Sequence, residues 1–173
     1  MTKKWMAGAG AAVLLALTGC GYALVGRGSN VPEDVREVYL QPLENRTQRS
    51  QVEQFLTRSI ADELVTRQRF AVVGSADTAD AVISGAVVGF ATTPVAFDGT
   101  GRATEYEIAI TAQISFKRTG SDEVLWSNDR YTFRESYPID PSEAGFFDRE
   151  DEAIEEAAHR FAEPMVSDLL EGF

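Results

Sequence analysis

The chain has few of the residues from which catalytic and metal sites are usually built. Its 173 residues include one cysteine, Cys20, and one histidine, His159. A single imidazole with no second nitrogen or thiolate ligand cannot build a zinc site. The sequence also has no Gly-x-Ser-x-Gly nucleophile elbow and no Gly-x-x-x-x-Gly-Lys phosphate loop. We therefore predict that the protein is not an enzyme and that it binds no metal and no dissociable cofactor.

Positive charge is also scarce. Lysine and arginine together number 16 against 27 acidic residues, which gives a net charge of −11. This balance argues against binding to a nucleic-acid backbone, which requires a clustered basic face. The acidic run 148–152 lacks the alternating, glycine-centred pattern of a calcium loop, and it is interpreted as the solvated start of a helix.

Five cations concentrate on the second half of the predicted strand meander and its turns: Arg102, Lys117, Arg118, Arg130 and Arg134. Two interpretations remain open for this group. The cations could receive an anionic partner such as a lipid phosphate. Alternatively, they pair across a hairpin with the acids around them: Glu105, Glu107, Asp122, Glu123 and Asp129.

A long hydrophobic run is missing as well. The most apolar stretch near the start, 7–17, is too short to span a membrane, which takes about 20 residues. It follows Lys3 and Lys4, and the small residues Thr18 and Gly19 come after it. This order of charge, apolar run and small residues is typical of an export signal.

The end of that signal, Leu17-Thr18-Gly19-Cys20, resembles a bacterial lipobox. The resemblance implies cleavage after Gly19, a diacylglycerol on the Cys20 thiol and an acyl chain on the new amino terminus. The alternative is an ordinary secretory signal with an incidental cysteine. A lone cysteine at the cut favours lipidation because exported proteins with disulfides carry cysteines in pairs. Several buried acyl chains would hold the protein firmly on a membrane.

The residue after the cysteine bears on location. Enterobacterial lipoproteins retained at the inner membrane carry Asp there, whereas this chain has Gly21. We therefore expect a protein that is lipid-anchored to the outer membrane on its periplasmic side.

The mature chain is long enough for one domain. Removing residues 1–19 leaves 154 residues with 14 basic and 27 acidic side chains, a net charge of −13. Residues 20–34 are rich in Gly, Ser, Asn and Pro and are interpreted as a lipidated tether. Residues 35–173 are then a single domain.

Hydrophobic periodicity predicts the elements of that domain. The clearest strand, 106–117, alternates strictly between apolar and polar residues. A capping box formed by Ser50 and Glu53 is expected to begin the first helix. Gly85 and Gly89 are expected at bulges or close approaches, and a second bulge is expected near Asn128. The expected strands are 36–43, 79–92, 106–117 and 123–135, with 70–73 as a further short candidate, and the expected helices are 50–67 and 148–170.

This order of elements predicts an α+β fold. A strand, a helix, a meander of three strands and a final helix give a four-stranded mixed or antiparallel sheet. Two amphipathic helices pack on one face of it, in the order β-α-β-β-β-α. Residues 93–101 are expected to form a loop, and 137–145 a linker.

Several stretches taken together resemble the lipopolysaccharide-assembly lipoprotein family LptE. They occur in the same order over nearly the whole mature chain, and the family's fold of two helices on a four-stranded sheet agrees with the periodicity. The stretches are Cys20-Gly21-Tyr22-Ala23-Leu24, the strand and turn 38–47, Ala79-Asp80-Ala81 and its continuation to Gly85, the loop 93–98 with 102–106, and Val124-Leu125-Trp126.

The resemblance implies a partner and a ligand. A member of this family is expected to sit inside the outer-membrane barrel LptD as a plug and assembly partner, and to contact lipopolysaccharide. Arg102, Lys117 and Arg118 are the candidate lipopolysaccharide-binding residues. The chain departs from the family pattern at Ala23 and Val25, where many members carry His and Arg.

A second class of function stays open. The turn 44–47, the helix after it and the run 69–73 also resemble small periplasmic lipoproteins such as the peptidoglycan-synthase activator LpoB. Such an activator needs a long tether, whereas the 14 residues 21–34 span at most about 50 Å. That reach favours a partner at the membrane itself. A structural lipoprotein with no assembly role is a third possibility.

Overall fold

The computed structural model describes residues 31–139 and 146–172, with side chains of the last helix described from Glu150 onward. The predicted signal, Cys20 and most of the predicted tether lie outside these residues. The elements are β1 (Glu37–Leu40), β2 (Glu44–Asn45), α2 (Val52–Arg67), β3 (Ala71–Val73), the 3₁₀ turn η1 (Ala76–Thr78), β4 (Ala81–Phe97), β5 (Ala103–Arg118), β6 (Val124–Pro138) and α3 (Phe146–Glu171).

The α+β class with two helices on one face is confirmed, but the sheet has six strands where four were predicted. Its order is β3-β1-β4-β5-β6, with β2 pairing separately along β4. β1 runs parallel to both β3 and β4, and β2 runs parallel to β4. The two additional strands have three and two residues. Strands this short cannot show a period of two, so their pairing depends on neighbours distant in the chain.

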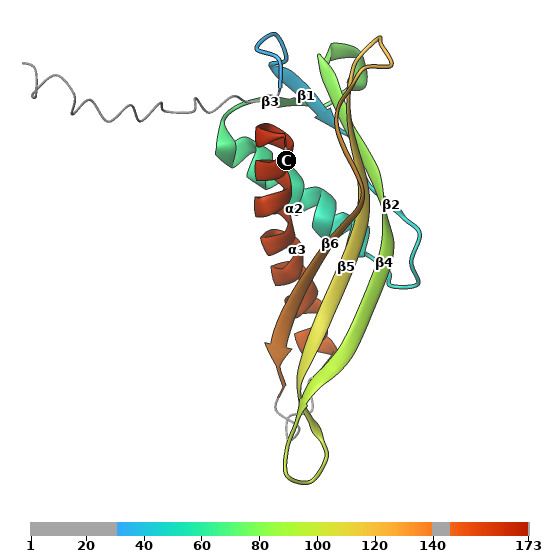
Figure 1. The fold of residues 1–173 in the computed structure, drawn as a ribbon, viewed down its shortest axis with the longest axis vertical. Helices are drawn as coiled ribbons and strands as arrows, with labels where there is room; N and C mark the ends of the chain where they lie inside the picture. Colours follow the sequence, from blue (N-terminus) through green and yellow to red (C-terminus); the bar gives the residue numbers. More distant parts are fainter. Residues whose placement is uncertain (1–30, 140–145, 173) are drawn as a thin grey trace, which may run out of the picture.

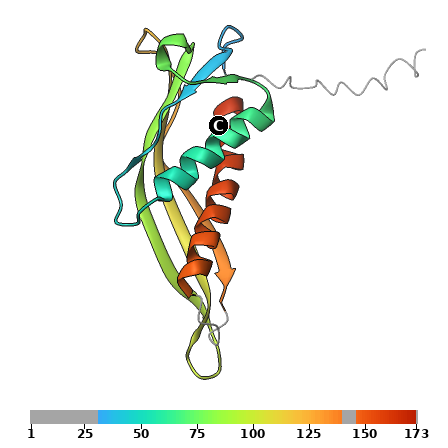
Figure 2. The same ribbon diagram turned by 180° about the vertical axis from the view of Figure 1, so that it is seen from behind.

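The antiparallel meander β4-β5-β6 runs along the longest dimension of the molecule (Figure 1). β4 continues to Phe97, so the predicted loop at 93–101 is wrong over its first half. Pro94 lies within this strand beside a register shift between Pro94 and Ala96. Proline is tolerated in strands at bulges, where its missing N–H removes no regular ladder bond. The turn is left with residues 98–102, and the hairpin projects beyond both helices (Figures 1 and 2).

The start of α2 differs from the predicted capping box. The residue before the helix is Gln51, in the left-handed region at φ 69°, and no side chain caps the helix. Glu53 turns instead to Asn45, whose Nδ2 donates to Glu53 Oε2 at 2.7 Å. The helix start is thus set by a contact with β2 and not by the local box. At the other end, α3 begins at Phe146, two residues before the predicted start.

The core lies between the sheet and the two helices (Figure 2). The predicted inner face of β5 is confirmed, because Ile108, Ile110, Ile114 and Phe116 are all 1 % exposed or less. Phe161 of α3 is fully buried there. Alternation along β5 therefore identified the buried side of the sheet from sequence.

The predicted bulge in β6 is also confirmed. Ala112 of β5 pairs with Tyr131, but two residues later Ile114 pairs with Asn128. The additional residue on β6 shifts the alternation, so Trp126 and Tyr131 both reach the helix side of the sheet. Tyr131 meets the ring of Phe161 edge-on, with centroids 5.2 Å apart.

Candidate functional site

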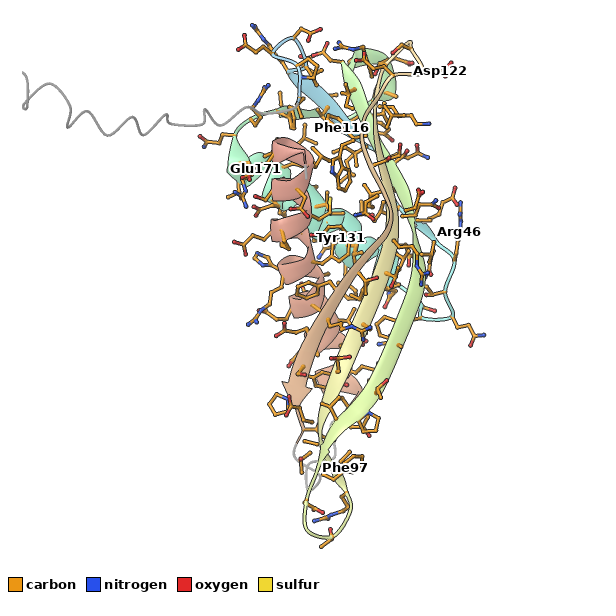
Figure 3. The ribbon with its side chains drawn as sticks, viewed as in Figure 1. Arg46, Phe97, Phe116, Asp122, Tyr131 and Glu171 are labelled. Atoms are coloured by element: carbon orange, nitrogen blue, oxygen red, sulfur yellow. The ribbon has the colours of Figure 1, made fainter. Side chains whose placement is uncertain are left out.

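The predicted lipopolysaccharide-binding residues do not converge on one site. Arg102 directly precedes β5, whereas Lys117 and Arg118 end it. A strand of this length spans about 50 Å. Figure 3 shows the same separation, with Phe97 near one end of the sheet and Asp122 near the other. The molecule therefore has two distinct basic positions.

The first position is the tip of the β4–β5 hairpin. Two apolar side chains are exposed there, Val95 at 48 % and Phe97 at 59 %. Asp98 organises the turn: its Oδ1 accepts from the Thr100 hydroxyl at 2.6 Å, and its Oδ2 accepts from Arg102 Nε at 3.1 Å. These bonds, with that of Thr100 the strongest, hold the pKa of Asp98 well below its usual range. The tip thus combines exposed apolar area with an arginine held in place.

The second position is the opposite end of β5, and pairing explains much of its charge. Arg118 donates to Asp34 and to Glu123, both at 2.7 Å, and these bonds raise the pKa of its guanidinium. Pairing across the hairpin is therefore observed for Arg118. Lys117 is exposed, and within the described part of the chain it has no ion pair. Of the two neighbours, Lys117 is the more available cation.

The sheet face turned away from the helices carries mostly small or polar side chains, among them the long Glu107, Gln113, Lys117 and Arg134. We call it the outer face and define it by Ser84, Gly89 and Ala91 of β4, Glu107, Ala109, Thr111, Gln113, Ser115 and Lys117 of β5, and Ser127, Thr132, Arg134 and Ser136 of β6. Three serines align directly across the strands, since Ser84 pairs with Ser115 and Ser115 with Ser127.

Further contacts on the outer face are also polar. The hydroxyls of Thr111 and Thr132 lie 3.0 Å apart, and Arg134 bonds Glu107 at 2.9 Å. A shallow hollow of about 490 Å³ opens over the serine row, bounded by Gln41 and Arg46 from the β1–α2 segment. Figure 3 shows Arg46 on this side and Tyr131 on the helix side. The outer face is therefore mostly polar, with the exposed Val124 beside Lys117 at one end of it.

Two residues that hold this architecture together were not singled out by sequence reasoning, although both lie in the segments that resemble the LptE family. Asn45 Nδ2 donates to the Arg49 carbonyl and to Glu53, each at 2.7 Å. Asp80 Oδ2 accepts from the backbone N–H groups of Arg36 and Glu37, each at 2.9 Å. Bonds from Glu37 and Arg36 lower the pKa of Asp80. For Asn45 the turn position was an available signal, because Asn side chains commonly bond nearby backbone. Asp80 bonds backbone groups distant in the chain, which no local pattern indicates.

The described residues contain no group of three or more metal-ligating side chains. Across residues 31–139 and 146–172, no helix is long and apolar enough to cross a membrane. His159 is an exposed residue of α3.

A family model described as "LptE: Lipopolysaccharide-assembly" matches residues 35–169. No curated protein sequence matches the chain. A solved structure described as a lipoprotein of Caulobacter crescentus is 18% identical with a TM-score of 0.53, covering 75% of this chain and 88% of that one. A minor lipoprotein of Acinetobacter baumannii is 10% identical with a TM-score of 0.50, covering 82% and 94%. Rare lipoprotein B of Shewanella oneidensis is 21% identical with a TM-score of 0.47, covering 76% and 95%.

Proposed function

The chain belongs to the LptE family of lipopolysaccharide-assembly proteins, and from that premise we propose that it is an outer-membrane lipoprotein that plugs an LptD-type β-barrel. In this proposal Cys20 carries the lipid anchor, the domain stands in the barrel lumen, and lipopolysaccharide contacts the protein during its insertion into the outer membrane. The description of the family model names assembly and no chemical transformation, so no catalytic role is proposed.

The outer face is the observation that carries the proposal. Lumens of membrane β-barrels are lined with polar residues, so a plug needs a polar surface and not an apolar one. Small side chains such as Ser84, Ser115 and Ser127 also let a second backbone approach closely. A sheet about 50 Å long is long enough to reach through the hydrocarbon thickness of a membrane, about 30 Å.

The orientation of the domain within the barrel follows from the end at which the chain enters the domain. Asp34, the last residue of the predicted tether, pairs with Arg118 at the end of β5, so the chain enters the domain at the end opposite the hairpin tip. An anchor on the periplasmic leaflet would therefore place the tip, with Phe97 and Arg102, deepest in the barrel. Exposed apolar area beside an arginine suits an amphiphile that carries both acyl chains and phosphate.

Recovery of partners from solubilised outer membranes tests the barrel assignment. Tagged, lipidated protein is expected to bring down a large β-barrel in near-equal amount. Ser115→Trp places a bulky ring in the serine row of the outer face and is expected to lose the barrel while the fold is retained. Gln54→Trp is the matched control, because Gln54 is exposed on α2, away from that face. Recovery of a peptidoglycan synthase with no barrel would support the LpoB-like alternative instead.

Binding of purified lipopolysaccharide tests the ligand residues. A single lipid headgroup cannot contact both ends of β5, so Arg102→Ala and the pair Lys117→Ala and Arg118→Ala are measured separately. We expect Arg102→Ala to weaken binding more, because of the apolar side chains beside it. An effect confined to Lys117 and Arg118 would move the contact to the anchor end. If neither Arg102→Ala nor the double variant weakened binding, these three residues would no longer be candidates for the lipopolysaccharide contact.

A further inference from the structure

A groove lies beside the edge strand β3. It measures about 690 Å³ and is walled by Val65 at the end of α2 and by Phe70 and Val72 around β3. Val65 is 60 % exposed, the highest fraction among the large apolar side chains of the described residues. β3 pairs with β1 on one side only, and no strand among the described residues pairs with its other edge. The groove therefore offers apolar surface together with the backbone donors and acceptors of a free edge.

The chain enters the domain along the wall of this groove. Val31 is already 3 % exposed. Arg69 lies over the ring of Phe70, with Cζ 5.2 Å from its centroid. The same guanidinium donates to the carbonyls of Pro32 and Val35, at 3.4 and 3.3 Å. The first described residues thus lie close to Glu33, which also lines the groove.

We propose that the apolar segment Tyr22–Val25 of this same chain docks in the groove. Tyr22, Leu24 and Val25 are the only large apolar residues between Cys20 and Val31. Five residues lie between Val25 and Val31, and the six steps from one to the other reach about 20 Å when extended. Charge gives no preference, because Arg27 is the only charged residue between Cys20 and Val31 and the groove is lined by Glu33 together with Arg36 and Arg69. The proposal therefore rests on apolar character and reach.

Docking would fix the domain relative to the membrane. Tyr22 is two residues from Cys20, so a docked segment would bring the acyl chains to the α2–β3 end of the domain. The hairpin tip would then point away from the anchoring leaflet. This inference concerns the chain alone and does not depend on the identity of any barrel partner.

Photo-crosslinking tests the proposal on lipidated protein in phospholipid vesicles. A photo-reactive amino acid replaces Leu24, and the cross-linked peptides are identified by mass spectrometry. The expected product joins residue 24 to residues 65–72 of the same chain. Val65→Glu should lower its yield about tenfold, since a tenfold population change corresponds to about 1.4 kcal/mol, close to the transfer free energy of one valine side chain.

Val124→Glu is the matched control. Val124 is 49 % exposed and does not line the groove, so its substitution should leave the yield unchanged. Thermal unfolding by circular dichroism checks that both variants fold, which we expect because both positions are exposed. Cross-links to other parts of the domain, to a second copy or only to lipid would overturn the proposal. An unchanged yield with Val65→Glu would overturn it too.

Discussion

A Cβ atom at Gly85 would lie 2.2 Å from the carbonyl oxygen of Gln113 and 3.0 Å from Cδ1 of Ile114. Gly85 is on β4, and both neighbours are on β5. No side chain larger than hydrogen fits this contact without moving the backbone. Strands β4 and β5 therefore approach each other closely at Gly85, which lines the hollow of the outer face.

Gly85→Ala should consequently lower the free energy of unfolding by about 2–3 kcal/mol, in the upper range of overpacking costs. The obstacle is backbone, which cannot rotate away as a flexible side chain would. Chemical denaturation provides the measurement. Gly74→Ala is the control, because nothing lies within 4 Å of its added methyl group. Equal stability of the two variants would contradict the contact.

Asn45→Ala should destabilise the domain by about 1–3 kcal/mol. The substitution removes four hydrogen bonds, to Arg49, to Glu53 and two from Thr47, and it leaves the partly buried partners unsatisfied. Ser50→Ala separates this arrangement from the predicted capping box. Because no side chain caps α2, Ser50→Ala should have little effect. If Ser50→Ala lowered stability as much as Asn45→Ala, the result would indicate that the predicted capping box does form.

Stability should fall as the pH rises from 10 to 12. Burial, followed by the charge of Asp168, raises the pKa of Tyr131 to about 12. Burial, followed by the charge of Glu150, raises the pKa of Tyr137 to about 12 as well. A raised pKa means that the folded state favours the neutral phenol, so the stabilisation is complete below pH 10 and is lost above it. Thermal unfolding measured across this pH range provides the test.

Tyr137→Phe should reduce that alkaline loss without destabilising the protein at neutral pH. The Tyr137 hydroxyl is buried and has no hydrogen-bond partner among the described residues. Removing an unsatisfied buried hydroxyl is expected to be neutral or to stabilise by up to about 1 kcal/mol. A clear destabilisation at pH 7 would show that the hydroxyl has a partner, such as a bound water.

Cys20→Ser should leave the domain folded but remove it from the outer-membrane fraction. Cys20 lies outside the described residues, whose buried core runs from Val31 to Leu169. Membrane fractionation gives the location, and circular dichroism of the purified protein gives the fold. A variant that still fractionates with the outer membrane would contradict the anchor.

Local sequence patterns predicted the elements that are long and regular. The alternation in β5 identified its buried face, and the parity change between Trp126 and Tyr131 located the bulge in β6. Gly85 and Gly89 were expected at a close approach or a bulge. Gly85 makes the close approach, and Gly89 follows the register shift after Val87. Each of these features is specified by residues adjacent in the chain, so the chain alone reveals them.

The sites depended on distance in space, which no local pattern contains. The sequence places Arg102 and Lys117 in one predicted basic region, on the same strand and its turns. An extended strand between them puts them about 50 Å apart. The sequence does not distinguish Arg118 from Arg102 and Lys117 as a candidate for lipopolysaccharide binding. The structure does, because Arg118 is paired with Asp34 and Glu123.

The sequence by itself determined the lipobox resemblance, the α+β class, the main strands and helices, and the resemblance to the family that the match over residues 35–169 confirmed. These depend on composition, order and short-range periodicity. Only the tertiary structure decided that β2 and β3 join the sheet, that Asn45 and not Ser50 sets the start of α2, and that the outer face is polar while a groove opens beside β3. Those features arise where segments far apart in the chain meet, and the free energy of such contacts depends on packing and not on local propensity.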